Sequence, residues 1–277
     1  MKQNPFSFYD FLGYMIPGAV LVYVAVFSFG FYGLVENLSL DSANNSAASQ
    51  LLSFIPAVIF SYLLGHVLAI FSSAFIEAFS TYSNGYPSQF LFNAKKKCYI
   101  CGKTFRRTIG RAILWVIVLP ISLSKLVITD ILGIKVFKQA KPLPEPLRTA
   151  AFNGCKRVLS DCVNVDTSSM CKEKGIEGDY LRLLYHFVFE QSDRHSGKLQ
   201  NYVALYGLTR NVSFVFVLLF WGSVYAYFFD KSMGVGIYHV CAFVVLAYIF
   251  YIGFVKFYRR YSLEAIMAAT IYQKHDG

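Results

Sequence analysis

Several polar side chains sit within the second long apolar stretch of the sequence, where they could carry out chemistry inside a membrane. Together with the small Ala69 they follow one another at steps of four, three, four and four residues and so share one face of a helix: Tyr62, His66, Ala69, Ser73 and Glu77. A histidine or glutamate that faced lipid would be costly, so this face looks into a helix bundle or into water.

Three interpretations of this stripe are open. In the first, His66 is satisfied by an interhelical hydrogen bond and Glu77 pairs with Arg210 or Arg111. In the second the stripe is a water-lined conduction path, and in the third it is a proton-coupled site. Histidine changes its charge near neutral pH, so a water-exposed His66 could gate by protonation.

A pair of cysteines gives the one pattern typical of a metal site. Cys98 and Cys101 have the spacing of a zinc knuckle and are followed by Gly102. The sequence contains no second CxxC and no HxxxH to complete the site. Five of the six cysteines lie in a segment that we expect in the cytoplasm, where thiols stay reduced. We therefore expect an unligated pair and no cofactor, with zinc binding or a redox pair as the alternatives.

Enzyme motifs are mostly absent. The run Gly102-Lys103-Thr104 matches the end of the phosphate-binding loop motif GxxxxGK[ST], but the first glycine of that motif is replaced by Lys97. The sequence has no HExxH, no GxSxG and no pair of carboxylates on a common apolar face. We expect no catalytic residues and no enzyme activity.

A basic patch is the other feature that points to binding. Seven positive charges fall within 17 residues: Lys95, Lys96, Lys97, Lys103, Arg106, Arg107 and Arg111. One interpretation is attraction to anionic lipid, worth about 1 kcal/mol per basic residue near the inner leaflet. The other is an anionic ligand such as a nucleotide or oligonucleotide, to which arginine offers bidentate phosphate contacts.

The elements that must position these residues are membrane helices. The chain is 56% apolar and only 15% charged, against about 25% charged in soluble domains. Four stretches without charge are each long enough to cross a bilayer, which takes about 20 helical residues: 11–35, 51–76, 211–229 and 232–255. We predict an all-α polytopic membrane protein with four transmembrane helices. We interpret the first stretch as a retained helix, because it is longer than the apolar core of a signal peptide.

Charge predicts the orientation of these helices. The loop 35–50 has two acidic residues and no lysine or arginine, whereas residues 80–200 carry 19 basic and 9 acidic residues, a net +10. Basic segments stay on the cytoplasmic side, so both termini should be cytoplasmic in a multi-pass protein of the inner membrane. We expect a first transmembrane hairpin (1–79), a basic cytoplasmic helical insertion (80–205), a second hairpin (206–258) and a cytoplasmic helical tail (259–277).

One part of the insertion is apolar as well. Residues 112–124 are uncharged but too few to cross alone, and basic residues flank the stretch 112–134 on both sides. An interfacial helix or a re-entrant hairpin satisfies both facts, and a fifth span is the alternative. Helical spacing predicts further helices over 147–165 and 179–191, with a break near residues 195–197 before the third span.

Several short strings lie across the chain: Tyr9-Asp-Phe-Leu-Gly-Tyr14, Ile16-Pro-Gly18, Gly65-His66, Ser72-Ser73, Glu77, Gly85-Tyr-Pro-Ser88 and Arg210-Asn211. Together they resemble a group of little-characterised bacterial multi-pass proteins that are associated with phage-defence gene neighbourhoods. The resemblance implies a membrane effector similar to the channel-forming partners of nucleotide-signalling defence systems such as CBASS or Hailong. It supplies no catalytic residues.

Two functions follow from these patterns. In the first, the chain is a homo-oligomeric ion channel or pore-forming effector, and the insertion senses a signal that hydrates the stripe from Tyr62 to Glu77. In the second, it is an accessory or scaffold membrane subunit, including an immunity-type protein, that recruits a soluble protein partner and conducts nothing. A channel needs a continuous polar face, whereas a scaffold needs only an exposed cytoplasmic surface.

Overall fold

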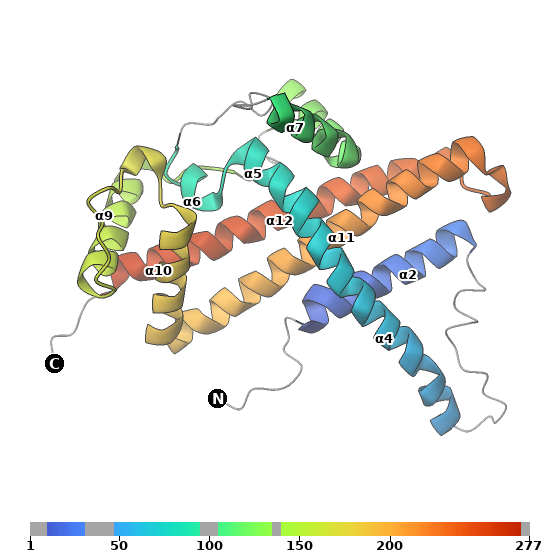
Figure 1. Ribbon diagram of the computed structural model, residues 1–277, viewed down its shortest axis with the longest axis horizontal. Helices are drawn as coiled ribbons and strands as arrows, with labels where there is room; N and C mark the ends of the chain where they lie inside the picture. The colour runs from blue at the N-terminus through green and yellow to red at the C-terminus, as the bar shows by residue number, and fades with distance from the viewer. Residues whose placement is uncertain (1–9, 31–46, 95–104, 135–139, 273–277) are drawn as a thin grey trace. The chain divides into compact units, whose positions relative to one another are not determined.

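The regular structure of the chain is helical. The computed structural model describes residues 10–30, 47–94, 105–134 and 140–272, with the backbone alone at 47–53, 193, 194 and 232. No strand occurs in these ranges. Four helices are long and apolar enough to cross a membrane: Phe11–Phe29, Phe54–Phe90, His195–Phe229 and Ile237–Ile271 (Figure 1). The predicted all-α class and the four candidate spans are thus confirmed.

The chain divides into two compact units. Unit 1 comprises Met1–Ala78, Ile113–Ile134 and Gly207–Phe254, and unit 2 comprises Phe79–Ala112, Lys135–Tyr206 and Val255–Gly277. Segment 113–134 therefore groups with the apolar helices. In the predicted domains it is the interfacial or re-entrant part of the insertion.

The first two apolar helices of unit 1 touch backbone to backbone. The first consists of a π-helical turn, η1 (Phe11–Met15), and α2 (Ile16–Phe29); the second is α4 (Ala47–Ser72), continued by the π-helical η2 (Ser73–Glu77). A Cβ on Gly18 would stand 1.8 Å from the Ser61 carbonyl oxygen, and one on Gly65 would stand 2.0 Å from that of Tyr14. Only glycine permits this approach, which is a recurring way for membrane helices to associate.

The two longest helices form a pair. Helix α11 (Asp193–Phe229) is followed by the short η6 (Lys231–Met233) and by α12 (Ile237–Ile271). In unit 1 the Ser213 hydroxyl donates to the Ala247 carbonyl oxygen over 2.9 Å. The break before α11 falls at Ser192, which has extended backbone, and α11 runs straight through residues 195–197 where the break was expected. A glycine inside a helix costs only about 1 kcal/mol, so Gly197 does not by itself end one.

A sharp bend interrupts the additional apolar segment. Helix α7 (Phe105–Ile117) meets α8 (Leu119–Lys125), which continues into the π-helical η3 (Leu126–Ile131), at 93°. Pro120 in the first turn of α8 has no N–H to extend the preceding helix. The carbonyls released at the bend have partners: the Ser122 hydroxyl donates to Trp115 over 2.9 Å and Trp221 Nε1 donates to Ile117 over 2.8 Å. The segment is thus a broken span or a re-entrant loop by length and composition.

Unit 2 has an apolar core of its own. Unit 2 contains α5 (Ala78–Asn84), α6 (Pro87–Phe90), the start of α7, α9 (Glu145–Asp161), η5 (Lys172–Lys174), α10 (Gly178–Gln191) and parts of α11 and α12. Helices α9 and α10 lie close to the ranges expected from the sequence. The most buried core side chains include Leu91, Leu159, Ile176, Leu184, Leu199 and Ile266. Burial also raises the pKa of the Cys155 thiol to about 12, so this cysteine is a core residue without nucleophilic reactivity.

The helix contact at Gly65 gives a direct test of this packing. We expect Gly65→Ala to lower the free energy of unfolding by about 1–3 kcal/mol, because the added methyl group meets the Tyr14 backbone and the helices must separate. Gly110→Ala is the matched control, since nothing lies within 4 Å of its Cβ position, and it should stabilise by up to about 1 kcal/mol. Unfolding in mixed micelles followed by tryptophan emission measures both. Equal stability of the two variants would contradict the close helix contact.

Candidate functional site

The strongest candidate site in unit 1 is a group of polar residues between apolar helices, here called the polar cluster: the Gly13 carbonyl, Ser72, Glu77, Arg210 and Asn211. Arg210 forms an ion pair with Glu77 over 2.6 Å, and its Nε donates to the Ser72 hydroxyl over 3.2 Å. Asn211 Nδ2 donates to the Gly13 carbonyl oxygen over 2.6 Å, and the Ser72 hydroxyl donates to Asn211 Oδ1. The polar cluster therefore connects three apolar helices: η1–α2, α4–η2 and α11.

Irregular helix geometry accompanies the polar cluster on two sides. Gly13 lies in η1 and Glu77 lies in η2, and both segments are π-helical. Such turns are rare, change the register of backbone hydrogen bonds and often occur at functional sites. The Asn211 side chain gives the Gly13 carbonyl oxygen a partner that does not come from its own helix.

Burial makes the polar cluster energetically important. Ser72 and Asn211 are 0% and 1% exposed, and the side chains of Arg210 and Glu77 are 10% and 25% exposed. A buried charge is tolerated only when it is paired and hydrogen-bonded, and removing one partner costs several kcal/mol. Arg210 is therefore held by Glu77 and Ser72 together, and any change that separates them should move α11 relative to α4.

His66 lies in an aromatic group beside the same helices. Its ring stacks on Tyr14 with centroids 3.9 Å apart and meets Tyr62 edge-on at 4.6 Å. Stacking of this kind holds an imidazole by its faces. His66 thus fixes the start of the first helix against α4.

The stripe predicted from the sequence lies at the border of the buried region. Tyr62, His66, Ala69 and Glu77 are half-buried, and Ser73 is exposed. The buried row of α4 is offset by one residue: Ser61, Gly65, Leu68 and Ser72. The Ser73 hydroxyl donates to Glu77 over 3.4 Å, so the stripe touches the polar cluster through Glu77. Of the two partners expected for Glu77, the structure has Arg210.

The basic patch is described only in part. Arg106 and Arg107 are exposed on α7, and Arg111 is half-buried with its guanidinium 4.6 Å from the centroid of the Tyr82 ring. Lys95, Lys96, Lys97 and Lys103 lie outside the described residues, as do Cys98 and Cys101. Within the described ranges, no group of three or more His, Cys, Asp or Glu residues could hold a metal ion.

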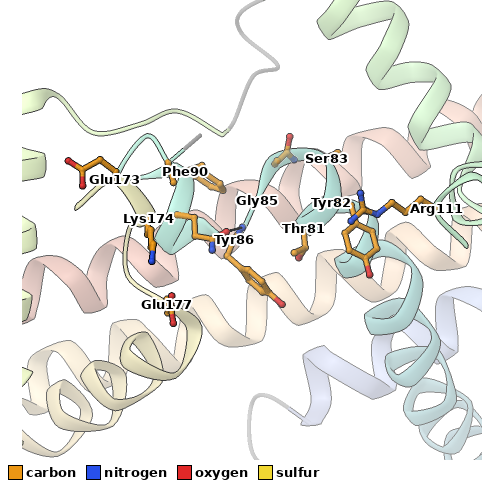
Figure 2. A pocket seen from close by; sticks show the side chains of 13 residues that line it. Thr81, Tyr82, Ser83, Gly85, Tyr86, Phe90, Arg111, Glu173, Lys174 and Glu177 are labelled. Carbon is orange, nitrogen blue, oxygen red and sulfur yellow. Dashed lines mark hydrogen bonds between the residues drawn. The ribbon is translucent and has the colours of Figure 1, made fainter. Parts of the chain in front are cut away.

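Arg111 also lines a groove of about 820 Å³ in unit 2, here called the Arg111 groove. Its wall follows residues 81–90 and is completed by Arg111 and by the loop that carries Glu173, Lys174 and Glu177. Figure 2 shows Arg111 beside Tyr82 at one end of the groove and the loop residues at the other, with Tyr86 between them. The sequence singled out Arg111 in the basic patch, but it did not predict a groove, because residues 81–94, Arg111 and residues 173–177 are far apart in the chain.

No family model, curated protein or solved structure matches the chain. Most of the short strings named in the sequence nevertheless meet in unit 1, whereas Gly85-Tyr-Pro-Ser88 belongs to unit 2. Gly13, Tyr14 and Gly18 contact α4 or Asn211, and Ser72 and Glu77 contact Arg210 or Asn211. The sequence offered Asn211 only as part of the string Arg210-Asn211 at the start of a charge-free stretch, and it did not predict the hydrogen bond from Asn211 to the Gly13 carbonyl oxygen.

Removing the amide of Asn211 tests the polar cluster. We expect Asn211→Leu to lower the free energy of unfolding by about 2 kcal/mol or more, because the Gly13 carbonyl and the Ser72 hydroxyl both lose a buried partner. Ser223→Ala is the matched control on the same helix, since the buried Ser223 hydroxyl has no hydrogen-bond partner among the described residues. Chemical unfolding in detergent should find this control unchanged within about 0.5 kcal/mol. A similarly small effect of Asn211→Leu would contradict a structural role for the polar cluster.

Proposed function

We propose that the chain is a multi-pass protein of a bacterial inner membrane that acts as a homo-oligomeric channel or pore-forming effector. In this proposal two transmembrane hairpins flank a cytoplasmic helical insertion that senses the signal, and both termini are cytoplasmic. The biological setting, antiphage defence, comes from the resemblance of the short strings described above. A nucleotide or oligonucleotide signal is the trigger that this setting favours.

The observation that carries the proposal is the partial exposure of the polar stripe on α4, from Tyr62 to Glu77, in the single chain. Ser73 is exposed on the single chain and donates to Glu77, whose carboxylate is itself 25% exposed although it pairs with Arg210. At membrane depth such groups avoid lipid and face water or another protein surface. A second copy of the chain would cover the stripe from Tyr62 to Glu77, and several copies would enclose water along it.

The bent segment supports the same function. Trp221 is ten residues from the start of the 19-residue charge-free stretch 211–229, or about 15 Å along the helix, which is half of a hydrocarbon core of about 30 Å. Trp221 Nε1 donates to the Ile117 carbonyl oxygen at the bend. Because Trp221 lies halfway along its span, we infer that the bend lies near the middle of the membrane. Irregular backbone is tolerated there only inside protein or along a water-filled cavity. A re-entrant hairpin also leaves the basic residues before and after it on one side of the membrane.

The proposed pore requires several copies of the chain, because one subunit is too small to enclose it. Four helices and one short hairpin cannot enclose a wide pore in a single subunit. In an apolar 18-residue window of each of the spans Phe11–Phe29 and Phe54–Phe90, only 22% and 17% is buried within the chain, so much of their surface is available to lipid and to other copies. Signal-driven movement of α11 would then reach the stripe through the Arg210–Glu77 ion pair.

Blocking the stripe tests conduction. Expression in bacteria with a potential-sensitive dye should show depolarisation, and Ser73→Leu should abolish it because a bulky apolar side chain fills the polar face. Ala74→Leu is the matched control: Ala74 is exposed on the adjacent face of the same turn, and its enlargement should leave depolarisation unchanged. Membrane fractionation checks that all three proteins insert equally.

The outcomes separate the two functions. Loss of depolarisation in Ser73→Leu alone supports a pore along the stripe. Equal depolarisation by Ser73→Leu and the native chain places the conduction path elsewhere and contradicts the proposal. A native chain that leaves the membrane potential normal, even during phage infection, favours the non-conducting accessory subunit.

A further inference from the structure

The Arg111 groove is large enough for an extended ligand. Its volume of about 820 Å³ lies in the upper part of the range of small-molecule sites, and all the residues that line it belong to unit 2. Gly175 has a φ of +72°, a Cβ there would stand 2.6 Å from the Ser88 carbonyl oxygen, and the Ile176 N–H donates to that same oxygen. The loop 173–177 is therefore fixed against the segment that forms the rest of the wall.

One end of the groove is suited to a phosphate. The Arg111 guanidinium lies 4.6 Å from the centroid of the Tyr82 ring. A guanidinium held over a ring directs its N–H groups outward in its own plane, and arginine binds phosphate oxygens with two such groups. The carboxylates of Glu173 and Glu177 line the other end (Figure 2), so a phosphate at Arg111 does not meet them.

An aromatic surface lies between the two charged ends. Tyr86 stands between Arg111 and the loop 173–177 (Figure 2), and it is 44% exposed. Among the described residues, its ring has no stacked or edge-on partner ring. Proteins that bind single nucleotides of a strand stack each base on an exposed aromatic side chain of this kind. The middle of the groove is therefore suited to a planar ring such as a nucleobase.

The other end offers both a donor and an acceptor. Lys174 and Glu177 line it, and within the described part of the chain neither side chain has a hydrogen bond or an ion pair. Glu173 accepts a hydrogen bond from the Cys171 thiol, which lowers the pKa of Glu173 and leaves Glu177 as the carboxylate for a ligand. Bases are read by hydrogen bonds to such an edge. Guanine places the acceptor O6 next to the donors N1–H and N2–H, which an ammonium and a carboxylate complement.

We propose that the Arg111 groove binds the guanosine phosphate group of a nucleotide. Arg111 holds the phosphate, and the guanine ring stacks on Tyr86. Glu177 accepts hydrogen bonds from N1–H and N2–H, and Lys174 donates to O6. A ribose and a purine ring separate the phosphate of this ligand from the edge of its base, so it can reach both charged ends. The role of this ligand as the signal rests on the proposed function, whereas its binding does not depend on conduction.

Ligand changes on the native full chain test these contacts without any substitution. Isothermal titration of the purified protein in detergent should give an affinity for guanosine monophosphate at least about tenfold above that for adenosine monophosphate, because adenine has an amino group where Lys174 needs an acceptor. Inosine monophosphate lacks the amino group of guanine, and guanosine lacks the phosphate. Each should bind about fivefold more weakly than guanosine monophosphate, as expected for the loss of one exposed contact.

Substitutions assign each contact to its residue. Arg111→Gln should weaken the binding of guanosine monophosphate about fivefold and leave that of guanosine unchanged. Tyr86→Leu should weaken binding about tenfold, whereas Tyr86→Phe keeps the ring and should bind like the native chain. Glu177→Ala should bind guanosine and inosine monophosphates equally, because the acceptor for the amino group is gone. Arg182→Gln and Glu190→Gln on α10 remove exposed charges that do not line the groove and should leave binding unchanged.

The outcomes separate this proposal from the proposed function. Binding of adenosine monophosphate or guanosine as tight as that of guanosine monophosphate overturns it, as does a preference for guanosine over inosine monophosphate that persists in Glu177→Ala. A short guanine-containing oligonucleotide that binds more tightly, with the same dependence on Arg111 and Glu177, would support the same contacts and identify an oligonucleotide as the source. A chain that selects guanosine monophosphate but leaves the membrane potential normal contradicts only the pore.

Discussion

The structure of unit 1 depends on the partners that the polar groups of α11 find among apolar helices. Arg210 reaches Glu77, Asn211 reaches the Gly13 carbonyl, Ser213 reaches the Ala247 carbonyl and Trp221 reaches the Ile117 carbonyl. Inside a bilayer water cannot replace these partners, so each contact fixes where another helix lies against α11. Burial of apolar surface is not selective in lipid, and such contacts and close packing decide which helices associate.

This constraint also explains where the helices can be irregular. The two π-helical turns occur where Gly13 and Glu77 meet α11, and the bend at Val118 occurs where Trp221 donates to the preceding carbonyl. Single π-helical turns inside α-helices often occur at functional sites. The proposed signal path from the insertion to the α4 stripe uses these positions.

Much of the architecture could be predicted because it depends on local composition. The charge-free stretches predicted all four candidate spans, because a run of about 20 apolar residues is typical of a transmembrane helix. Helical spacing placed α9 and α10 within a few residues, and a glutamate at membrane depth indicated a basic partner. The break before α11 was misplaced because Gly197 suggests a break by its type alone, whereas the chain turns at Ser192.

The parts that were not predicted depend on long-range contacts. The face of α4 that is buried is one residue away from the predicted stripe, because Gly18 and Tyr14 contact it at Ser61 and Gly65. The bond from Asn211 to Gly13 and the Arg111 groove join segments that are far apart in the sequence. No periodicity within one helix contains that information.

The ion pair between Glu77 and Arg210 offers the most direct test of the account. A double-mutant cycle with Glu77→Gln, Arg210→Gln and the double variant measures its coupling through the free energy of unfolding in detergent. We expect each single change to cost about 2–4 kcal/mol, because a charge is left unpaired, and the double change to cost at least about 1.5 kcal/mol less than their sum. Additive losses would mean that the pair does not hold α4 against α11, and the account of unit 1 would be wrong.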